Sequence, residues 1–190
     1  MDTLAHGLWG GMIAGWKKRF GLAFLFGMAP DLLSFGLWLA IRWMHGQFQR
    51  GRPDVHFLPD WLHTAYNFTH SLFIIGALWA LLWWWNREIA VPFSAWIIHI
   101  LCDIPTHSRS FFPTPFLFPL SDYTVDGISW GQTWFMILNY SCLLALSLAW
   151  AYSRHRRRRK VRLKVSPQPQ SGPSAEQPVE IGPASSSRST

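Results

Sequence analysis

The sequence has few of the residues that hold small soluble domains together through disulfides or thiolate metal sites. It contains only two cysteines, Cys102 and Cys142, and both lie inside apolar runs. They show neither the paired spacing of a thiolate metal site nor the repeated cysteines of a disulfide framework. Charge is also scarce, because Asp, Glu, Lys and Arg together make up 14% of the chain. The compartment therefore has to be inferred from the apolar pattern.

The net charge of +7 lies entirely in the C-terminal tail. Residues 1–153 carry eight basic and eight acidic side chains (8 − 8 = 0), whereas residues 154–190 carry nine basic and two acidic ones (9 − 2 = +7). This distribution argues against a basic globular domain that wraps nucleic acid, so no nucleic-acid partner is expected. Residues 154–165 instead predict a basic juxtamembrane segment that binds anionic lipid headgroups, at about 1 kcal/mol per residue.

The neutral part is too apolar and aromatic for an ordinary soluble domain, with 13 Trp and 14 Phe. A helix needs about 20 apolar residues to cross a bilayer. The sequence predicts an all-α polytopic membrane bundle whose four spanning helices are Phe20–Met44, Thr64–Trp85, Ile89–Ser108 and Gln132–Tyr152. Thr3–Trp16 predicts a short N-terminal helix. It is unlike a signal peptide, because basic residues follow it instead of preceding it.

The remaining segments read as non-helical. Gly46–Pro59 predicts a loop, and the proline-rich Phe111–Gly131 predicts an irregular segment at the membrane interface. Residues 166–190 are too polar to order themselves and predict a disordered tail. The chain thus divides into a membrane domain (1–153), the basic segment (154–165) and the tail. Basic residues favour the cytoplasmic side, so the Lys17–Arg19 cluster and the C-terminus are both predicted there.

Ionisable residues inside the apolar runs are the strongest functional signal. An Asp or His at membrane depth costs about 2.5–3.5 kcal/mol or more unless it is paired, protonated or bound to metal. The runs nevertheless contain His6, Asp31, His70, His99, Asp103 and His107. His99 and Asp103 share one helix face through their i,i+4 spacing, and Asp31 follows a proline that opens a helix. Under the predicted topology, one cavity open to the outer side could gather them.

Imidazole and carboxylate ligands suit Zn, with Mn or Fe possible, better than Ca. Three His and two Asp around one or two ions would leave room for a water whose pKa the metal lowers to about 7. Candidates to orient the ligand imidazoles, or to add a ligand, are Asp2, Thr69, Ser71, Thr106 and His107.

Each position also has a purely structural interpretation. A single membrane His commonly bonds a backbone carbonyl, and His99 with Asp103 could form a local hydrogen bond. Asp31 could cap a helix that begins after Pro30.

Four short motifs carry a resemblance to a known family: Asp2–Gly7, Ala29–Asp31, Thr69–Ser71 and His99–Asp103. In this order they resemble the YdjM-like family of bacterial inner-membrane proteins regarded as metal-dependent hydrolases. The segment Pro113–Trp130 resembles the same family, so the likeness covers roughly residues 1–150. It implies a metal site made of His6, Asp31, His70, His99 and Asp103. It also implies a distant similarity to zinc-dependent phospholipase C and P1-type nucleases, and hence phosphoester hydrolysis.

Three functions are compatible with the sequence. The first is a hydrolase in the inner membrane, facing the outer side, that cleaves a phosphoester of a lipid or membrane-associated substrate through a metal-bound water. Asp31 or Asp103 would serve as ligand or base. The second is a transporter or an ion or proton relay through the same residues, although the apolar inner halves of the helices count against it. The third is a structural or regulatory membrane protein whose tail binds a partner.

Overall fold

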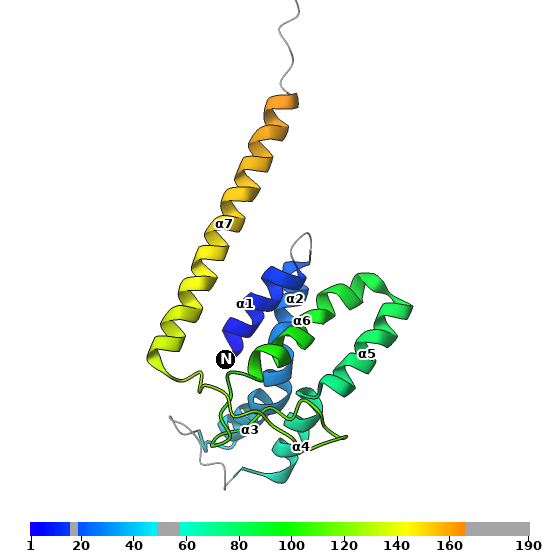
Figure 1. The fold of residues 1–190 in the computed structure, drawn as a ribbon, viewed down its shortest axis with the longest axis vertical. Coiled ribbons are helices and arrows are strands. Elements are labelled where there is room, and N and C mark those ends of the chain that lie inside the picture. The colour runs from blue at the N-terminus through cyan, green and yellow to red at the C-terminus, as the bar shows by residue number, and fades with distance from the viewer. Residues whose placement is uncertain (16–18, 49–57, 166–190) are drawn as a thin grey trace, which may run out of the picture. The chain divides into compact units, whose positions relative to one another are not determined.

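All regular secondary structure in the described residues is helical (Figure 1). The structure is a computed structural model that describes residues 1–15, 19–48 and 58–165. In chain order the helices are α1 (Thr3–Ala14), α2 (Phe20–Asp31), the π-helical turn η1 (Leu32–Gly36), α3 (Leu37–Met44), α4 (Asp60–Thr69), α5 (Leu72–Trp85), α6 (Arg87–Asp103) and α7 (Thr133–Val165). Internal contacts divide the chain into two units, Met1–Trp150 and Ala151–Thr190. The candidate site lies in the first.

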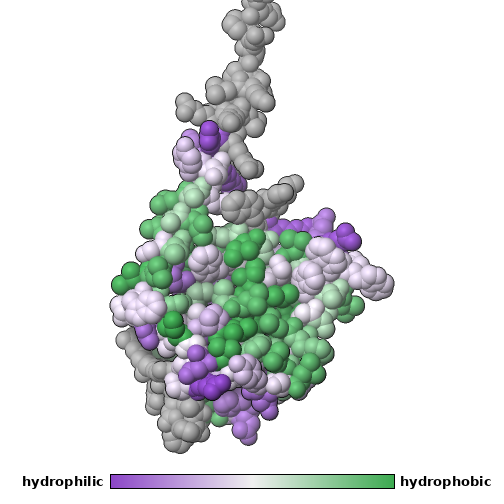
Figure 2. Space-filling model, in the orientation of Figure 1, coloured by the Kyte–Doolittle hydropathy of each residue, from purple (hydrophilic) through white to green (hydrophobic). Residues whose placement is uncertain are grey.

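Two helical segments of the described residues are long and apolar enough to cross a membrane. They are Phe20–Met44, with 25 residues, and Thr133–Arg156, with 24 residues. A third exists if α4 and α5, which are bent by 49° relative to each other, form one broken span. Figure 2 shows a broad area of hydrophobic side chains on one face, with hydrophilic side chains gathered at its margins. The all-α prediction is confirmed for these residues, while the fourth span and the sidedness stay predictions.

Small residues let α1, α2 and α6 approach one another closely. A Cβ added to Gly10 of α1 would lie 2.8 Å from the Cβ of Ala95 in α6. One added to Gly27 of α2 would lie 2.6 Å from the backbone oxygen of His6. Glycine and alanine at such contacts allow the tight helix packing typical of membrane proteins. This packing brings the start of α1, the end of α2 and the end of α6 to one place.

The predicted helix Thr64–Trp85 is broken at His70 and Ser71, which differs from the single span expected. The Ser71 hydroxyl caps α5 by accepting the Ile74 N–H at 3.1 Å. The Leu72 N–H donates to the carbonyl of Phe116, 2.9 Å away in the proline-rich segment. A break at membrane depth is tolerated when such partners satisfy the freed backbone groups. The break places His70 at the turn between α4 and α5.

The interpretation of Asp31 as a helix cap is wrong. The helical backbone continues through Pro30 and Asp31, whose φ of −67° and ψ of −43° are helical, into η1. The Asp31 side chain makes no cap hydrogen bond. A π-helical turn directly after a proline is a common way to absorb the lost backbone hydrogen bond. The carboxylate of Asp31 is thereby left for other partners.

The C-terminal helix is longer than the span predicted from hydropathy. Instead of ending near Tyr152, α7 continues to Val165. Residues 153–165 contain neither Gly nor Pro, and Arg, Lys and Leu are good helix formers. The Phe111–Gly131 segment contains no helix or strand, as predicted. Most of the predicted Gly46–Pro59 loop (49–57) and the predicted disordered tail lie outside the described residues.

Candidate metal centre

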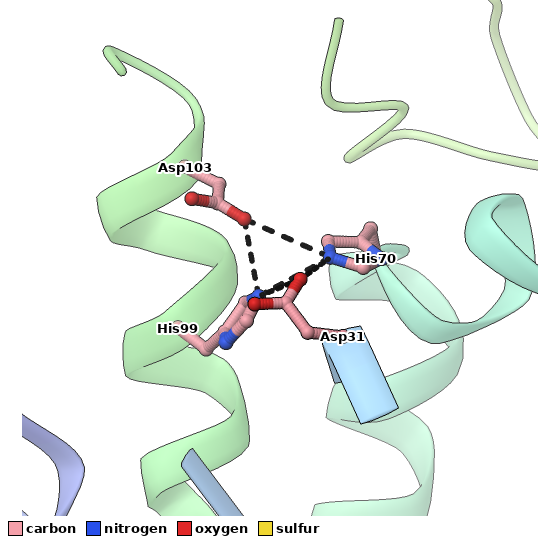
Figure 3. A group of neighbouring side chains, drawn as sticks. All are labelled: Asp31, His70, His99 and Asp103. Atoms are coloured by element: carbon pink, nitrogen blue, oxygen red, sulfur yellow. Dashed lines mark hydrogen bonds and ion pairs between the residues drawn. The ribbon is translucent and has the colours of Figure 1, made fainter. Parts of the chain in front are cut away.

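Four ionisable side chains from three parts of the chain point toward one another (Figure 3). Asp31 comes from the end of α2, His70 from the break between α4 and α5, and His99 and Asp103 from the last turns of α6. One ligand atom from each lies within 4.8 Å of the other three. The side chains of His70, His99 and Asp103 are 0% exposed, while that of Asp31 is 17% exposed. Solvent therefore reaches this four-residue cluster beside Asp31.

Both imidazoles of the cluster are held through Nδ1. His99 Nδ1 lies 2.7 Å from the carbonyl oxygen of Gly27, and His70 Nδ1 lies 3.1 Å from that of Tyr66. A carbonyl can only accept, so each Nδ1 carries a hydrogen, and in the neutral ring Nε2 then carries a lone pair. The alternative that these histidines bond backbone carbonyls is thus right, but only for their Nδ1 atoms. It leaves both Nε2 atoms facing the cluster, as in ligand histidines whose other nitrogen is bonded to a backbone carbonyl.

The spacing of the ligand atoms fits one small ion. Nε2 of His99 lies 3.2 Å from Nε2 of His70, 3.1 Å from Asp103 Oδ2 and 3.6 Å from Asp31 Oδ1. Nε2 of His70 lies 3.7 Å from each of the same two oxygens. A tetrahedral ion with bonds of about 2.0–2.2 Å has ligand atoms about 3.3–3.6 Å apart. These five distances, 3.1–3.7 Å, depart from that range by at most 0.2 Å.

The electrostatics of the four-residue cluster call for positive charge at its centre. Two imidazole lone pairs and two carboxylate oxygens face one another away from water. Asp103 Oδ2 is buried, and its nearest partner in the cluster is His99 Nε2 at 3.1 Å, the local i,i+4 contact that the sequence allowed. Only a cation, whether a metal ion or additional protons on the imidazoles, offsets such repulsion. The buried His/Asp group could hold a metal ion.

His6 contacts the opposite side of Asp103. Its Nε2 lies 2.8 Å from Asp103 Oδ1, and its ring stacks on that of His99 with centroids 3.7 Å apart. Among the described residues, the buried Nδ1 of His6 has no hydrogen-bond partner. His107 Nδ1 lies 3.3 Å from the same Oδ1, which also accepts from the amino group of Met1 at 2.8 Å. These histidines adjoin the four-residue cluster without joining it.

The supporting contacts agree only in part with the sequence candidates. Thr69 Oγ1 lies 3.0 Å from His70 Nδ1, as expected of a residue that orients an imidazole. The hydroxyl of Thr3 donates to Asp31 Oδ2 at 2.8 Å, a contact that was not predicted. The sequence did contain a signal for this contact, because Thr3 lies one helical turn before His6 and therefore shares its helix face.

The other three candidates bond elsewhere. Asp2 caps α1 and accepts from the Tyr140 hydroxyl at 2.9 Å. Ser71 caps α5, and Thr106 donates to the carbonyl of Cys102 at 2.9 Å and accepts from the amino group of Met1. They fix the helix ends that surround the cluster and touch no imidazole in any described contact.

Comparison of the chain with protein-family models, with curated proteins and with solved structures found no match. The resemblance to the YdjM-like family therefore stays a prediction that rests on the quoted motifs. Three of the four motifs supply the members of the four-residue cluster, and the first supplies Thr3 and His6.

Proposed function

We propose that this chain is a membrane-embedded, metal-dependent hydrolase of the YdjM-like type. Its substrate would be a phosphoester of a lipid or a membrane-associated molecule. One observation carries the proposal: two imidazole Nε2 atoms and two carboxylate oxygens converge in a buried site at metal-ligand spacing. Two nitrogen and two oxygen donors without a thiolate favour Zn, with Mn or Fe as alternatives. The proposal includes a bacterial inner membrane, a cytoplasmic C-terminus and a site facing the outer side.

The proposed role of each residue follows from its exposure to solvent. A divalent ion in such a site would supply Lewis acidity and lower the pKa of bound water to about 7. Asp103 and the two imidazoles are fully buried and would hold the ion. Asp31 is the cluster's partly exposed member, so it would be both the outermost ligand and the group that accepts a proton from incoming water. Thr3 fixes the other oxygen of Asp31 and keeps Oδ1 directed at the cluster.

His6 belongs to the proposal as the ligand of a second ion. Asp103 presents Oδ2 to the four-residue cluster and Oδ1 to His6, so Asp103 and His6 would be the residues that hold a second ion. We expect two metal ions per wild-type chain and one in His6→Ala. A wild-type protein with a single ion that His6→Ala retains would remove His6 from the ligand set.

Metal analysis of the purified full-length protein tests the proposal directly. Wild type should contain stoichiometric metal and hydrolyse bis(p-nitrophenyl) phosphate, and His70→Ala should lose both. The matched control is His45→Ala, because His45 is exposed and lies outside the cluster. Wild-type protein without stoichiometric metal would overturn the proposal.

The break at His70 also favours a second candidate, an ion or proton relay, because broken helices line the binding sites of many transporters. Such a path needs polar residues that continue across the membrane. The α5 sequence beyond the break, Leu72–Trp85, contains no charged or hydrogen-bonding residue except its tryptophans. Zinc or proton flux into proteoliposomes, without hydrolysis, would favour the relay.

A further inference from the structure

A second candidate site lies in a cavity of about 310 Å³, here called the loop pocket. From α4 it is lined by His63, Tyr66 and Asn67, and from the proline-rich segment by Arg109, Phe112 and Asp122, among others. Small-molecule sites have volumes of about 300–1,000 Å³, with apolar walls and a few converging polar groups. The loop pocket has both features, because its lining contains aromatic rings as well as nitrogen donors.

Tyr66 connects the loop pocket to the four-residue cluster. Its ring stacks on His70 with centroids 3.8 Å apart, and its hydroxyl donates to the carbonyl of Phe112. Phe112 has a φ of +44°, a left-handed conformation that is costly for a bulky side chain. Such conformations persist where the surroundings enforce them, and they cluster at binding sites. A molecule in the loop pocket would therefore lie one side chain away from His70.

The charged groups of the loop pocket indicate what it binds. Arg109 is held in place by Nη2 donating to the carbonyl of Thr124 at 2.9 Å. Asp126 accepts the backbone N–H of Arg109, and among the described residues no carboxylate pairs with its guanidinium. Arginine presents a fork of N–H donors that suits phosphate oxygens. Asp122 is the acid in the lining, and its negative charge opposes anion binding, so Arg109 and the apolar walls have to outweigh it.

We propose that the loop pocket binds the phosphate group of an amphiphilic phosphoester. Arg109 contacts a phosphate oxygen, and the aromatic walls contact the apolar part. This inference deepens the proposed function by naming how the substrate is held, and it rests on that function only for what happens after binding. The binding step depends on no residue of the four-residue cluster.

The test is a calorimetric titration of the full-length protein in detergent with dihexanoyl phosphatidic acid. Arg109→Gln should weaken this binding by about tenfold or more, because a charge-assisted hydrogen bond is lost. Asp122→Asn should strengthen it. The matched control is Arg42→Gln, since Arg42 also donates from its guanidinium to one backbone carbonyl, that of Gln47, and lies outside the loop pocket. Equal losses in the two arginine variants would overturn the proposal.

Further ligands separate the possible sources of the phosphate. Dihexanoylglycerol, which lacks phosphate, should bind weakly and equally to wild type and Arg109→Gln. Glycerol 3-phosphate and inorganic phosphate should bind more weakly than the diacyl compound, because they lack the apolar part. Equal affinity for glycerol 3-phosphate and dihexanoyl phosphatidic acid would overturn the amphiphilic assignment.

Chelation keeps this inference distinct from the proposed function. With the metal removed by EDTA, the Arg109-dependent binding of dihexanoyl phosphatidic acid should persist. If it persists in a protein that never contains metal, the loop pocket stands and the hydrolase proposal fails. If wild type contains metal and Arg109→Gln binds like wild type, the loop pocket fails and the hydrolase proposal stands. Arg109→Lys, which keeps the charge and loses the fork, should lie between wild type and Arg109→Gln.

Discussion

Each half of α6 has a buried face, yet different forces hold the two halves. In the first half, Arg87–Ala95, Phe93 packs edge-on against Phe26 with ring centroids 5.1 Å apart, and Ala95 meets Gly10. In the second half, residues 96–103, the buried positions include the ionisable side chains of His99 and Asp103. One continuous helix therefore combines an apolar contact surface with a polar site.

The difference shows which half depends on an additional component. A buried apolar side chain stabilises the fold by about 1.5–3 kcal/mol without any further partner. A buried carboxylate costs several kcal/mol unless positive charge and hydrogen bonds offset its desolvation. The first half of α6 is therefore stable through packing alone. The second half depends on positive charge beside its carboxylate, which the Met1 amino group supplies at Oδ1 and which a metal ion held by the four-residue cluster could supply at Oδ2.

The largest effect should come from Asp103→Asn, which removes the negative charge of the second half at almost constant size. Loss of residues that only support a ligand already weakens metal binding by about 10–100-fold. We therefore expect metal affinity to fall by more than about 100-fold, with helix content retained. Metal titration and circular dichroism measure the two quantities. Asp60→Asn, at an exposed position in the first turn of α4, is the control and should bind metal like wild type.

Gly27→Ala should break the packing that aligns both halves. The added Cβ would lie 2.6 Å from the His6 carbonyl oxygen, a backbone atom that cannot move aside. Overpacking of this kind costs about 1–3 kcal/mol. The control is Gly76→Ala in α5, where an added Cβ has no neighbour within 4 Å and should stabilise the helix by about 0.5–1 kcal/mol. Thermal unfolding in detergent that shows equal changes for the two variants would contradict the packing role.

The site residues around the second half of α6 could be predicted from the sequence for a simple physical reason. His99 and Asp103 interrupt an apolar run at i,i+4 spacing, and Asp31 and His70 interrupt two others. Ionisable groups at such positions are costly, so they stand out wherever the surroundings are apolar. The hydrogen bonds that orient these side chains could not be predicted from the sequence. The carbonyl of Gly27, which fixes His99, belongs to a backbone that carries no side-chain signal.

The break at His70 shows the same limit at the level of the fold. Thr64–Trp85 reads as one apolar run, because hydropathy registers composition and not the partners of the backbone. The break depends on Phe116, more than forty residues further along the chain, whose carbonyl accepts the Leu72 N–H. Apolar composition also fails to distinguish lipid neighbours from protein neighbours. The run Ile89–Ser108 reads as a span, yet much of α6 is buried against α1, α2 and α5.

Thr3→Val should weaken the polar site of α6 and leave its apolar packing unchanged. Valine keeps the shape of threonine and removes the hydroxyl that donates to Asp31 Oδ2. A supporting residue of this kind contributes about tenfold or more to metal affinity. The control is Thr64→Val, because the Thr64 hydroxyl donates only to the carbonyl of Asp60 on an exposed face. Metal affinity should fall in Thr3→Val alone, with the unfolding temperature of the metal-free protein unchanged in both variants.

The smallest effect should come from Arg19→Gln at the opposite end of α6. Arg19 donates to the carboxylate and to the backbone carbonyl of Glu88, and the two side chains are 40% and 76% exposed. Exposed ion pairs contribute about 0.2–1 kcal/mol, and salt screens them. We expect a small loss of unfolding temperature that shrinks in high salt, with metal content unchanged. A loss as large as that of Gly27→Ala would mean that charge, and not packing, holds the first half of α6, and the distinction between its halves would then fail.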